Sequence, residues 1–368
     1  MRKFKLKITT NNNKYNVIIG QNLLNNFLKI LNTNSINFGK CLIVIDKNVP
    51  KKFIKKINFL LRRKKIFNYI FNPSEKNKSQ KSVNKILNLL LKKNFHRNDC
   101  LISVGGGITG DVSSFAASIF KRGLKFVNVP STLLAQVDSS IGGKTGVNSK
   151  YGKNLIGTFY QPDLVISDTK LLVSLNKREI ICGYAEILKH ALIKNKKLFK
   201  YLEKNGKKVM KLNSPYIEKA IHESCLIKKK IIEKDENEKN FRKVLNFGHT
   251  FGHAYEATLN YSKKLNHGEA VLLGINCAAN FSLQRKILMR KDYLLIKNHF
   301  YKLNLPIKIS KFFSKKNLNK ILSFMQKDKK NNNSKINLIL LKKIGQVGYK
   351  YYYNALIVNK FLKNQLVD

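Results

Sequence analysis

The sequence lacks the features of membrane and secreted proteins. No apolar run approaches the roughly 18 residues that a membrane helix needs, and the N-terminal segment has no apolar core of a secretory signal. The five cysteines are far apart and include no CxxC pair, so neither a disulfide framework nor a cysteine-based zinc site is expected. These absences predict a cytoplasmic protein that has no membrane partner.

Acidic residues are scarce as well, with 21 aspartates and glutamates against 71 lysines and arginines and a net charge of +50. Such a charge is typical of nucleic-acid-binding proteins. The lysines, however, are spread along the chain beside many asparagines and isoleucines, whereas residues 101–150 contain only four lysines. A binding patch would be concentrated, so we expect no nucleic-acid partner, although the field would attract anionic substrates.

The pattern of the chain changes near residue 175. Before it, buried-strand runs alternate with amphipathic helical runs, which predicts an α/β domain over 1–175 with a mainly parallel sheet. After it, 3.6-residue periodicity dominates and only 335–341 resembles a strand, which predicts an all-α domain over 176–368. We expect the active site in a cleft between the two. The strands expected in the first domain are 40–46, 66–71, 99–104, 125–129 and 164–166.

A glycine-rich turn follows the strand expected over 99–104. Residues 105–107 are three consecutive glycines, and Asp111 comes four residues later in a GGGxxGD pattern. Glycines let the backbone approach an anion, and the N-terminus of a following helix offers free N–H groups. The pattern differs from the GxGxxG of standard dinucleotide folds, and Asp46 is the candidate for an adenosine ribose. The turn predicts a nucleotide cofactor; a tight turn without a ligand, with Asp111 as a helix cap, is the alternative.

Three of the seven histidines, His249, His253 and His267, lie in a short stretch. His249 and His253 are four residues apart and share one helix face, and this spacing alone favours them as a metal-ligand pair. Glu186 is a candidate carboxylate. Two histidines and one carboxylate around an open position are typical of catalytic zinc. The alternative is that some of these histidines only pack between helices.

Lys144 and Arg122 stand out among the cations because lysine is scarce around them. Any one lysine of this chain is more simply explained as a solvated charge. Where lysine is scarce, however, a cation suits the binding of phosphate or carboxylate, and arginine can bind either with two hydrogen bonds.

The motif blocks follow one another in a specific order. They are GGGITGD, PSTLLAQVDSSIGGKTGVN, GYAEILKH, DENE, LNFGHTFGHA, HGEAV and DKK. In this order they resemble the 3-dehydroquinate synthase family of sugar-phosphate cyclases over about residues 46–330. The resemblance implies a Rossmann-like N-terminal domain, a helical C-terminal domain, NAD as a recycled oxidant, and Zn²⁺ or Co²⁺. It implies a carbon–oxygen lyase of the shikimate pathway that converts 3-deoxy-D-arabino-heptulosonate 7-phosphate into 3-dehydroquinate and phosphate.

The resemblance also implies roles for single residues. Glu186, His249 and His267 match metal ligands, which replaces the pair favoured by spacing, and His253 matches a catalytic histidine. Arg122 matches an arginine that reaches a neighbouring subunit's site, which implies a homodimer. The residues that match cofactor contacts are Asp46, Glu75, Lys78, Gly105, Gly106, Gly107, Asp111, Ser131, Thr132, Asp138, Lys144 and Lys153. Those that match substrate contacts are Lys144, Asn154, Lys189, Lys228, Arg242, Asn246 and, within Asp328–Lys330, Lys330.

Two alternative functions share this two-domain plan. One is another sugar-phosphate cyclase, and the other is a metal-dependent polyol dehydrogenase that releases NADH. Arg242 and Lys228, as binders of a substrate carboxylate, argue against the first. A clamp for two anionic ends argues against the second, because a polyol has no anionic end to bind. Its residues are Lys144, Asn154, Arg242 and Asn246.

Overall fold

The computed structural model describes residues 3–11, 13–327 and 335–366. The chain forms two compact units. The first comprises Met1–Asn176 and Leu212–Asn237, and the second comprises Lys177–Lys211 and Glu238–Asp368. The expected domains, 1–175 and 176–368, differ from these units in the segment 212–237, and that division stays a prediction. Among the described helices, none combines the length and apolar character that crossing a bilayer requires.

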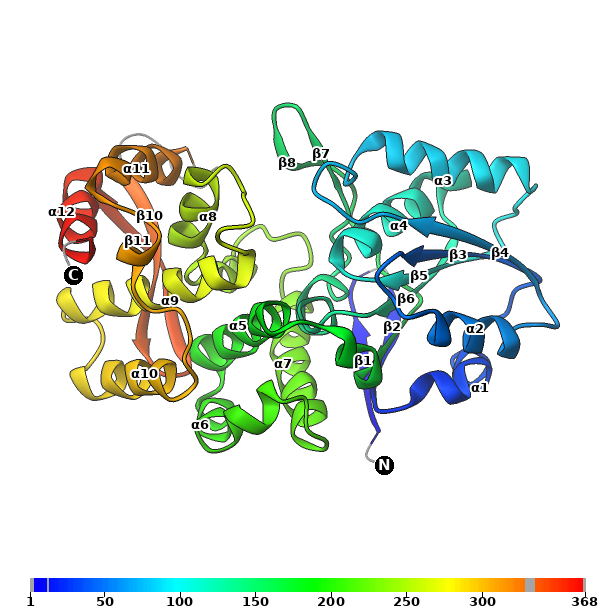
Figure 1. Ribbon diagram of the computed structural model, residues 1–368, viewed down its shortest axis with the longest axis horizontal. Coiled ribbons are helices and arrows are strands. Elements are labelled where there is room, and N and C mark those ends of the chain that lie inside the picture. The colour runs from blue at the N-terminus through cyan, green and yellow to red at the C-terminus, as the bar shows by residue number, and fades with distance from the viewer. Residues whose placement is uncertain (1–2, 12, 328–334, 367–368) are drawn as a thin grey trace. The chain divides into compact units, whose positions relative to one another are not determined.

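A seven-stranded sheet forms the centre of the first unit, in the order β1-β2-β9-β6-β5-β3-β4 (Figure 1). β1 is antiparallel to β2, and the other neighbouring pairs are parallel. The five strands expected from the sequence are present, which confirms the mainly parallel α/β sheet. The strands are β1 (Phe4–Thr9), β2 (Lys14–Gly20), β3 (Lys40–Asp46), β4 (Lys65–Phe71), β5 (Cys100–Gly105), β6 (Lys125–Pro130) and β9 (Leu164–Asp168).

Successive side chains of a strand point to opposite faces of the sheet, and in β3 the side chains of both faces are buried. Along β3, Cys41, Ile43 and Ile45 belong to one hydrophobic core, and Leu42 and Val44 belong to the other. Figure 1 shows helices on both sides of the sheet. The helices of the first core are α1 (Phe27–Thr33) and α2 (Lys51–Leu60), and those of the second are α3 (Gln80–Lys92) and α4 (Gly107–Ile119).

The strand order reverses between β3 and β5. From β3 the chain continues to β4 on one side, whereas β5 lies on the other side and is followed outward by β6 and β9. Asp46 ends β3 and Gly105 ends β5, so these residues lie on either side of the reversal at the carboxyl edge of the sheet. Open α/β sheets bind their ligands at such a point. The fold therefore places the glycine turn where a cofactor is expected.

The segment 212–237 joins the first unit through α7 (Tyr216–Ile232). Cys225 Sγ lies 3.4 Å from the carbonyl oxygen of Gln136, and the Thr169 hydroxyl donates to Glu218 Oε1 at 2.8 Å. These groups are buried, so the contacts satisfy polar atoms that water does not reach. As a result Lys228, which the sequence pattern assigned to the second domain, lies in the first unit. A short hairpin, β7 (Val147–Ser149) and β8 (Gly152–Ile156), completes this unit.

The second unit is mainly helical, as expected, but it is not all-α. β10 (Lys335–Lys343) covers the strand expected at 335–341, and it pairs antiparallel with β11 (Gln346–Asn354). The sequence pattern did not predict β11. Its side chains are half-buried or exposed, and its four tyrosines and one valine do not alternate regularly with polar residues. The helices are α5 (Lys177–Lys194), α6 (Lys196–Met210), α8 (His249–Thr258), α9 (His267–Gln284), α10 (Arg290–Lys302), α11 (Leu318–Gln326) and α12 (Ala355–Gln365).

Glycines allow α5, α8 and α9 to approach one another very closely. A Cβ atom on Gly274 would lie 2.0 Å from the carbonyl oxygen of Gly248, and one on Gly268 would lie 2.1 Å from Cys182 Cα. Gly248 also has a φ of +80°, which favours glycine. Because α8 and α9 both begin with a histidine, these contacts bring the two histidines and α5 together.

His299 is a buried histidine whose protonation should affect stability. Its Nε2 lies 2.8 Å from the Tyr184 hydroxyl, and burial, with the Lys302 charge, lowers the pKa of His299 from 6.5 to about 4. The unfolded chain binds a proton near pH 6.5 and the folded chain only near pH 4. The contribution of neutral His299 to the unfolding free energy is therefore complete above pH 6.5. Up to about 3 kcal/mol of this free energy is lost as the pH falls towards 4.

We expect His299→Gln to flatten the pH dependence of the unfolding free energy between pH 7 and 4, as measured by urea denaturation. His96→Gln, at an exposed position, is the control and should keep the wild-type slope. Equal slopes in the wild type and His299→Gln would contradict this account.

Candidate functional site

Three helices of the second unit bring a set of metal-binding side chains together. Glu186 on α5, His249 on α8 and His267 on α9 place one ligand atom each within 4.8 Å of one another. His249 Nε2 lies 3.6 Å from Glu186 Oε1, and the ring centroids of His249 and His267 are 5.7 Å apart. Two imidazoles and one carboxylate are a donor set that suits Zn²⁺. The grouping matches the set implied by the resemblance, whereas His253 is not part of it.

The protonation states in this cluster fit a divalent cation. Glu186 is 1% exposed, and its two carboxylate oxygens lack a hydrogen bond within the described structure, although the Lys189 ammonium forms an ion pair with it. A buried carboxylate is costly unless a positive charge lies beside it. Burial, followed by the Lys189 charge, lowers the pKa of His249 well below its usual value. The ring is therefore neutral at pH 7 and has a lone pair for a metal.

His253 lies one helical turn after His249 on α8. Its side chain is exposed, and its ring centroid lies 5.0 Å from that of His249 and 6.1 Å from that of His267. It is therefore beside the ligand cluster and open to solvent. This position suits a group that exchanges protons with a bound substrate.

Glu256 is a residue of this site that the sequence analysis missed. Its Oε2 accepts a hydrogen bond from His267 Nδ1 at 3.0 Å. A signal was present in the sequence, because Glu256 follows His249 by seven residues and His253 by three. Residues at these intervals share one face of a helix.

In the first unit, the glycine turn connects the end of β5 to the start of α4. Gly106 is the N-cap of α4. The first N–H groups of a helix have no partner within the helix, so they can donate hydrogen bonds to an anion. A Cβ atom on Gly106 would lie 3.1 Å from Thr132 Cγ2, and one on Gly107 would lie 3.0 Å from Ser139 Oγ. Thr132 and Ser139 thus pack so closely against the turn that larger residues than glycine would force them to move.

Asp46 fixes the shape of this turn. Its Oδ2 accepts from the Gly106 N–H and the Thr109 hydroxyl, both at 3.3 Å, and its Oδ1 accepts from the Asn48 N–H at 2.9 Å. The side chain is buried, with 5% of its surface exposed. Asp46 therefore joins the ends of β3 and β5, and its predicted contact with a ribose stays a prediction.

A network of charges in the first unit joins predicted cofactor and substrate residues. Lys78 Nζ lies 2.6 Å from Asp111 Oδ2 and 2.5 Å from Asn154 Oδ1. Lys228 Nζ lies 2.5 Å from Asp138 Oδ1. Burial raises the pKa of Asp111, and the Lys78 charge opposes that rise. Residues predicted to contact the cofactor and residues predicted to contact the substrate therefore lie side by side, and both roles stay predictions.

The other residues of the first unit that are predicted to contact the cofactor or the substrate lie around the glycine turn or at the surface. The Ser131 N–H donates to the carbonyl oxygen of Gly105 at 2.8 Å, and Thr132 Oγ1 accepts from the Ala135 N–H, so both support the turn. Lys153 Nζ forms an ion pair with Glu75 Oε1 at 3.2 Å on the surface. Lys144 is exposed.

Two predicted substrate residues of the second unit lie in the 3₁₀ segment Phe241–Asn246. Arg242 is buried, with 3% of its surface exposed, and Asn246 Nδ2 donates to Glu238 Oε1 at 3.1 Å. Lys189, also predicted to bind substrate, forms an ion pair with the proposed ligand Glu186, and its substrate role stays a prediction. Lys330 lies outside the described residues.

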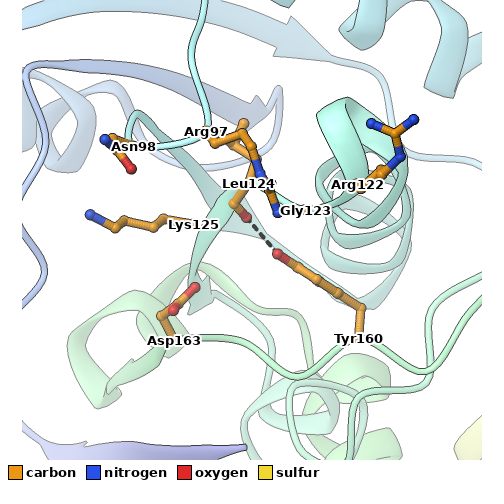
Figure 2. Close-up of a pocket in the computed structure, with 8 residues that line it drawn as sticks. All are labelled: Arg97, Asn98, Arg122, Gly123, Leu124, Lys125, Tyr160 and Asp163. Carbon is orange, nitrogen blue, oxygen red and sulfur yellow. Dashed lines mark hydrogen bonds between the residues drawn. The ribbon is translucent and has the colours of Figure 1, made fainter.

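Arg122 is exposed and lines an open pocket of about 510 Å³ with Arg97, Lys125, Tyr160 and Asp163 (Figure 2). The pocket lies where β6 begins, since Lys125 is its first residue, and so at the amino edge of the parallel sheet. The glycine turn lies at the opposite, carboxyl edge. Arg122 is therefore remote from the turn of its own chain, and its predicted role towards another subunit stays a prediction.

Comparisons with known proteins agree with this arrangement. The family models of the N-terminal and C-terminal parts of 3-dehydroquinate synthase match residues 68–182 and 183–331. The chain is 63% identical to the 3-dehydroquinate synthase of Pelagibacter ubique (strain HTCC1062) over 366 residues, which covers 100% of both chains.

Two of the solved structures that share the fold are synthases with bound NAD⁺ and a metal ion. A 2-deoxy-scyllo-inosose synthase complexed with carbaglucose-6-phosphate, NAD⁺ and Co²⁺ has a TM-score of 0.86 and 23% identity, with 98% of this chain and 100% of that chain covered. The 2-epi-5-epi-valiolone synthase of Streptomyces hygroscopicus subsp. jinggangensis 5008, with NAD⁺ and Zn²⁺ bound, has a TM-score of 0.85 and 23% identity, with 99% of both chains covered. At this identity the likeness shows the fold, whereas the full-length match and the family models decide the family. The chain belongs to the 3-dehydroquinate synthase family.

Proposed function

We propose that this chain acts as a 3-dehydroquinate synthase. It converts 3-deoxy-D-arabino-heptulosonate 7-phosphate into 3-dehydroquinate and phosphate, as a carbon–oxygen lyase of the shikimate pathway. The observation that carries the proposal is the full-length match to an enzyme of that name. The cluster of Glu186, His249 and His267 supports it, because it provides the cation site that the chemistry needs.

NAD and a divalent cation, Zn²⁺ or Co²⁺, are the proposed cofactors. Synthases of the same fold bind NAD⁺ together with Co²⁺ or Zn²⁺. The glycine turn and the N-terminus of α4 would hold the cofactor pyrophosphate, and Glu186, His249 and His267 would hold the cation. When bound, NAD supplies a reversible hydride transfer and the cation lowers the pKa of a substrate hydroxyl.

The chain's own residues bind the substrate and move its proton. We assign proton transfer between the substrate hydroxyl and solvent to His253, because it is exposed beside the ligand cluster. Arg242 and Lys228 would bind the substrate carboxylate, Arg242 with two hydrogen bonds. Lys144, Asn154 and Asn246 would bind the phosphate. These contacts hold one substrate conformer, which removes much of the entropic barrier to ring closure.

We also propose that the chain acts in the cytoplasm as a homodimer in which Arg122 reaches the partner's site. The exposure of Arg122 and its place at the amino edge of the sheet support this role. An Arg122→Ala protein that remained a dimer with full activity would contradict it.

Phosphate release tests the proposed reaction. With the heptulosonate phosphate and NAD, we expect phosphate release without accumulation of NADH, because the cofactor is reoxidised in each turnover. Chelation should abolish the release, and added Zn²⁺ or Co²⁺ should restore it. Full activity of the metal-stripped protein would contradict the cation site.

The same assay separates the alternatives. Accumulation of NADH with a simple polyol would indicate a polyol dehydrogenase. Faster phosphate release from a sugar phosphate that lacks the carboxylate would indicate another cyclase.

A further inference from the structure

We infer that Glu256 is a positioning residue for the proposed metal ligand His267, an inference that rests on the proposed function. The Glu256 carboxylate accepts the Nδ1–H of His267 at 3.0 Å. It thereby holds the imidazole in the tautomer whose Nε2 carries the lone pair. That nitrogen then serves the cation shared with Glu186 and His249.

The geometry supports a fixed acceptor. Glu256 is 8% exposed and lies on α8, on the same face as His249 and His253. A carboxylate can only accept, so Nδ1 of His267 must be the donor in this contact. Since a neutral imidazole carries one proton, Nε2 is left unprotonated. Carboxylates bonded to the second nitrogen of a ligating histidine fix its orientation and raise its basicity.

Packing leaves little freedom in this contact. α8 and α9 meet where Gly274 packs against the carbonyl oxygen of Gly248, so the two helices cannot shift without a collision. The ring of His267, at the first turn of α9, is thus presented to α8 at a set distance. Asn266 caps α9 through a capping box with Glu269, which fixes the backbone at His267.

A second cation is the competing explanation of the same atoms. His253, Glu256 and His267 also place ligand atoms within 4.8 Å of one another. A ring that served one cation through Nδ1 and another through Nε2 would have to lose both protons, which a neutral imidazole does not do. The positioning role needs no such change, and we favour it.

The test is the Zn²⁺ affinity of Glu256→Gln, measured without substrate by competition with a chromophoric chelator. Glutamine has nearly the same shape but carries no charge, so we expect the dissociation constant for Zn²⁺ to rise about tenfold to a hundredfold. The visible absorption bands of the Co²⁺-loaded protein should also shift, because the donor strength of His267 changes. Glu256→Leu should weaken binding further, provided that its circular dichroism is that of a folded protein.

Asp292→Asn is the matched control. Asp292 is a buried carboxylate on α10 of the same unit, and it accepts from the Ile344 N–H at 3.3 Å. We expect this variant to lose some stability but to keep the wild-type Zn²⁺ affinity and Co²⁺ spectrum. A general loss of packing would instead affect both variants alike.

Three results would overturn the inference, and they are distinguishable from failure of the proposed function. One is a folded Glu256→Gln protein with unchanged Zn²⁺ affinity and Co²⁺ spectrum. The second is equal loss of affinity in Asp292→Asn. The third is a wild type that binds two Zn²⁺ per chain and a Glu256→Gln variant that binds one with unchanged affinity, which would show a second cation site. If the wild type bound no Zn²⁺ or Co²⁺, the cation site of the proposed function would fail first.

Discussion

His253→Ala is expected to lower the rate of phosphate release by about 10²–10⁴-fold while its zinc content stays near that of the wild type. The reason is geometric. His253 is exposed beside the cluster of Glu186, His249 and His267 but does not belong to it. Removing its ring should therefore remove a path for the proton and leave the three ligands in place. Turnover and the metal content after dialysis are the two measurements.

His249→Ala provides the contrast. His249 lies 3.6 Å from Glu186 and, because of its lowered pKa, is neutral at pH 7. Its loss should reduce both bound zinc and activity, and added zinc should restore little activity. The exposed His96 in the first unit offers a control, since His96→Ala should change neither quantity. Equal zinc loss in His253→Ala and His249→Ala would reverse the assigned roles.

The sequence predicted the central sheet well because the signal there is local. The apolar residues of β3 and β5 occur in short continuous runs, and such runs bounded by turns indicate strands buried on both faces. The unit against which α7 packs could not be predicted in this way. Helical periodicity shows that a segment has an apolar face but not which surface covers it, and α7 packs in the first unit against Gln136 and Thr169.

The same limit applies to the metal cluster. The four-residue spacing of His249 and His253 describes one helix, and taken alone it favours His253 as the partner of His249. The structure instead places ligand atoms of Glu186 of α5, His249 and His267 of α9 within 4.8 Å of one another. Ligands from three helices converge only through tertiary contacts. The resemblance of the motif blocks to the 3-dehydroquinate synthase family was what indicated Glu186, His249 and His267 as the ligands. Glu256, which matched no motif used in the sequence analysis, was found from its contact with His267.

Those tertiary contacts depend on glycine, so Gly268→Ala should damage the site although it removes no functional group. The new Cβ atom would lie 2.1 Å from Cys182 Cα and 2.8 Å from Cys182 Sγ. Since the nearest atom belongs to the backbone of α5, the start of α9 must move away, and His267 precedes Gly268 directly. We expect a loss of about 3 kcal/mol in unfolding free energy and a Zn²⁺ affinity at least about tenfold weaker. Urea denaturation and chelator competition measure the two effects.

Gly39→Ala separates this effect from the general consequence of adding a methyl group. A Cβ atom on Gly39 meets no atom within 4 Å, and its φ is not in the left-handed region. We expect its stability to stay within about 0.5 kcal/mol of the wild type, with unchanged Zn²⁺ affinity. Gly274→Ala, whose Cβ atom would lie 2.0 Å from the carbonyl oxygen of Gly248, should resemble Gly268→Ala, because it separates α9 from α8 instead of α5. If both variants bound Zn²⁺ like the wild type, the cluster would not depend on the close approach of these helices.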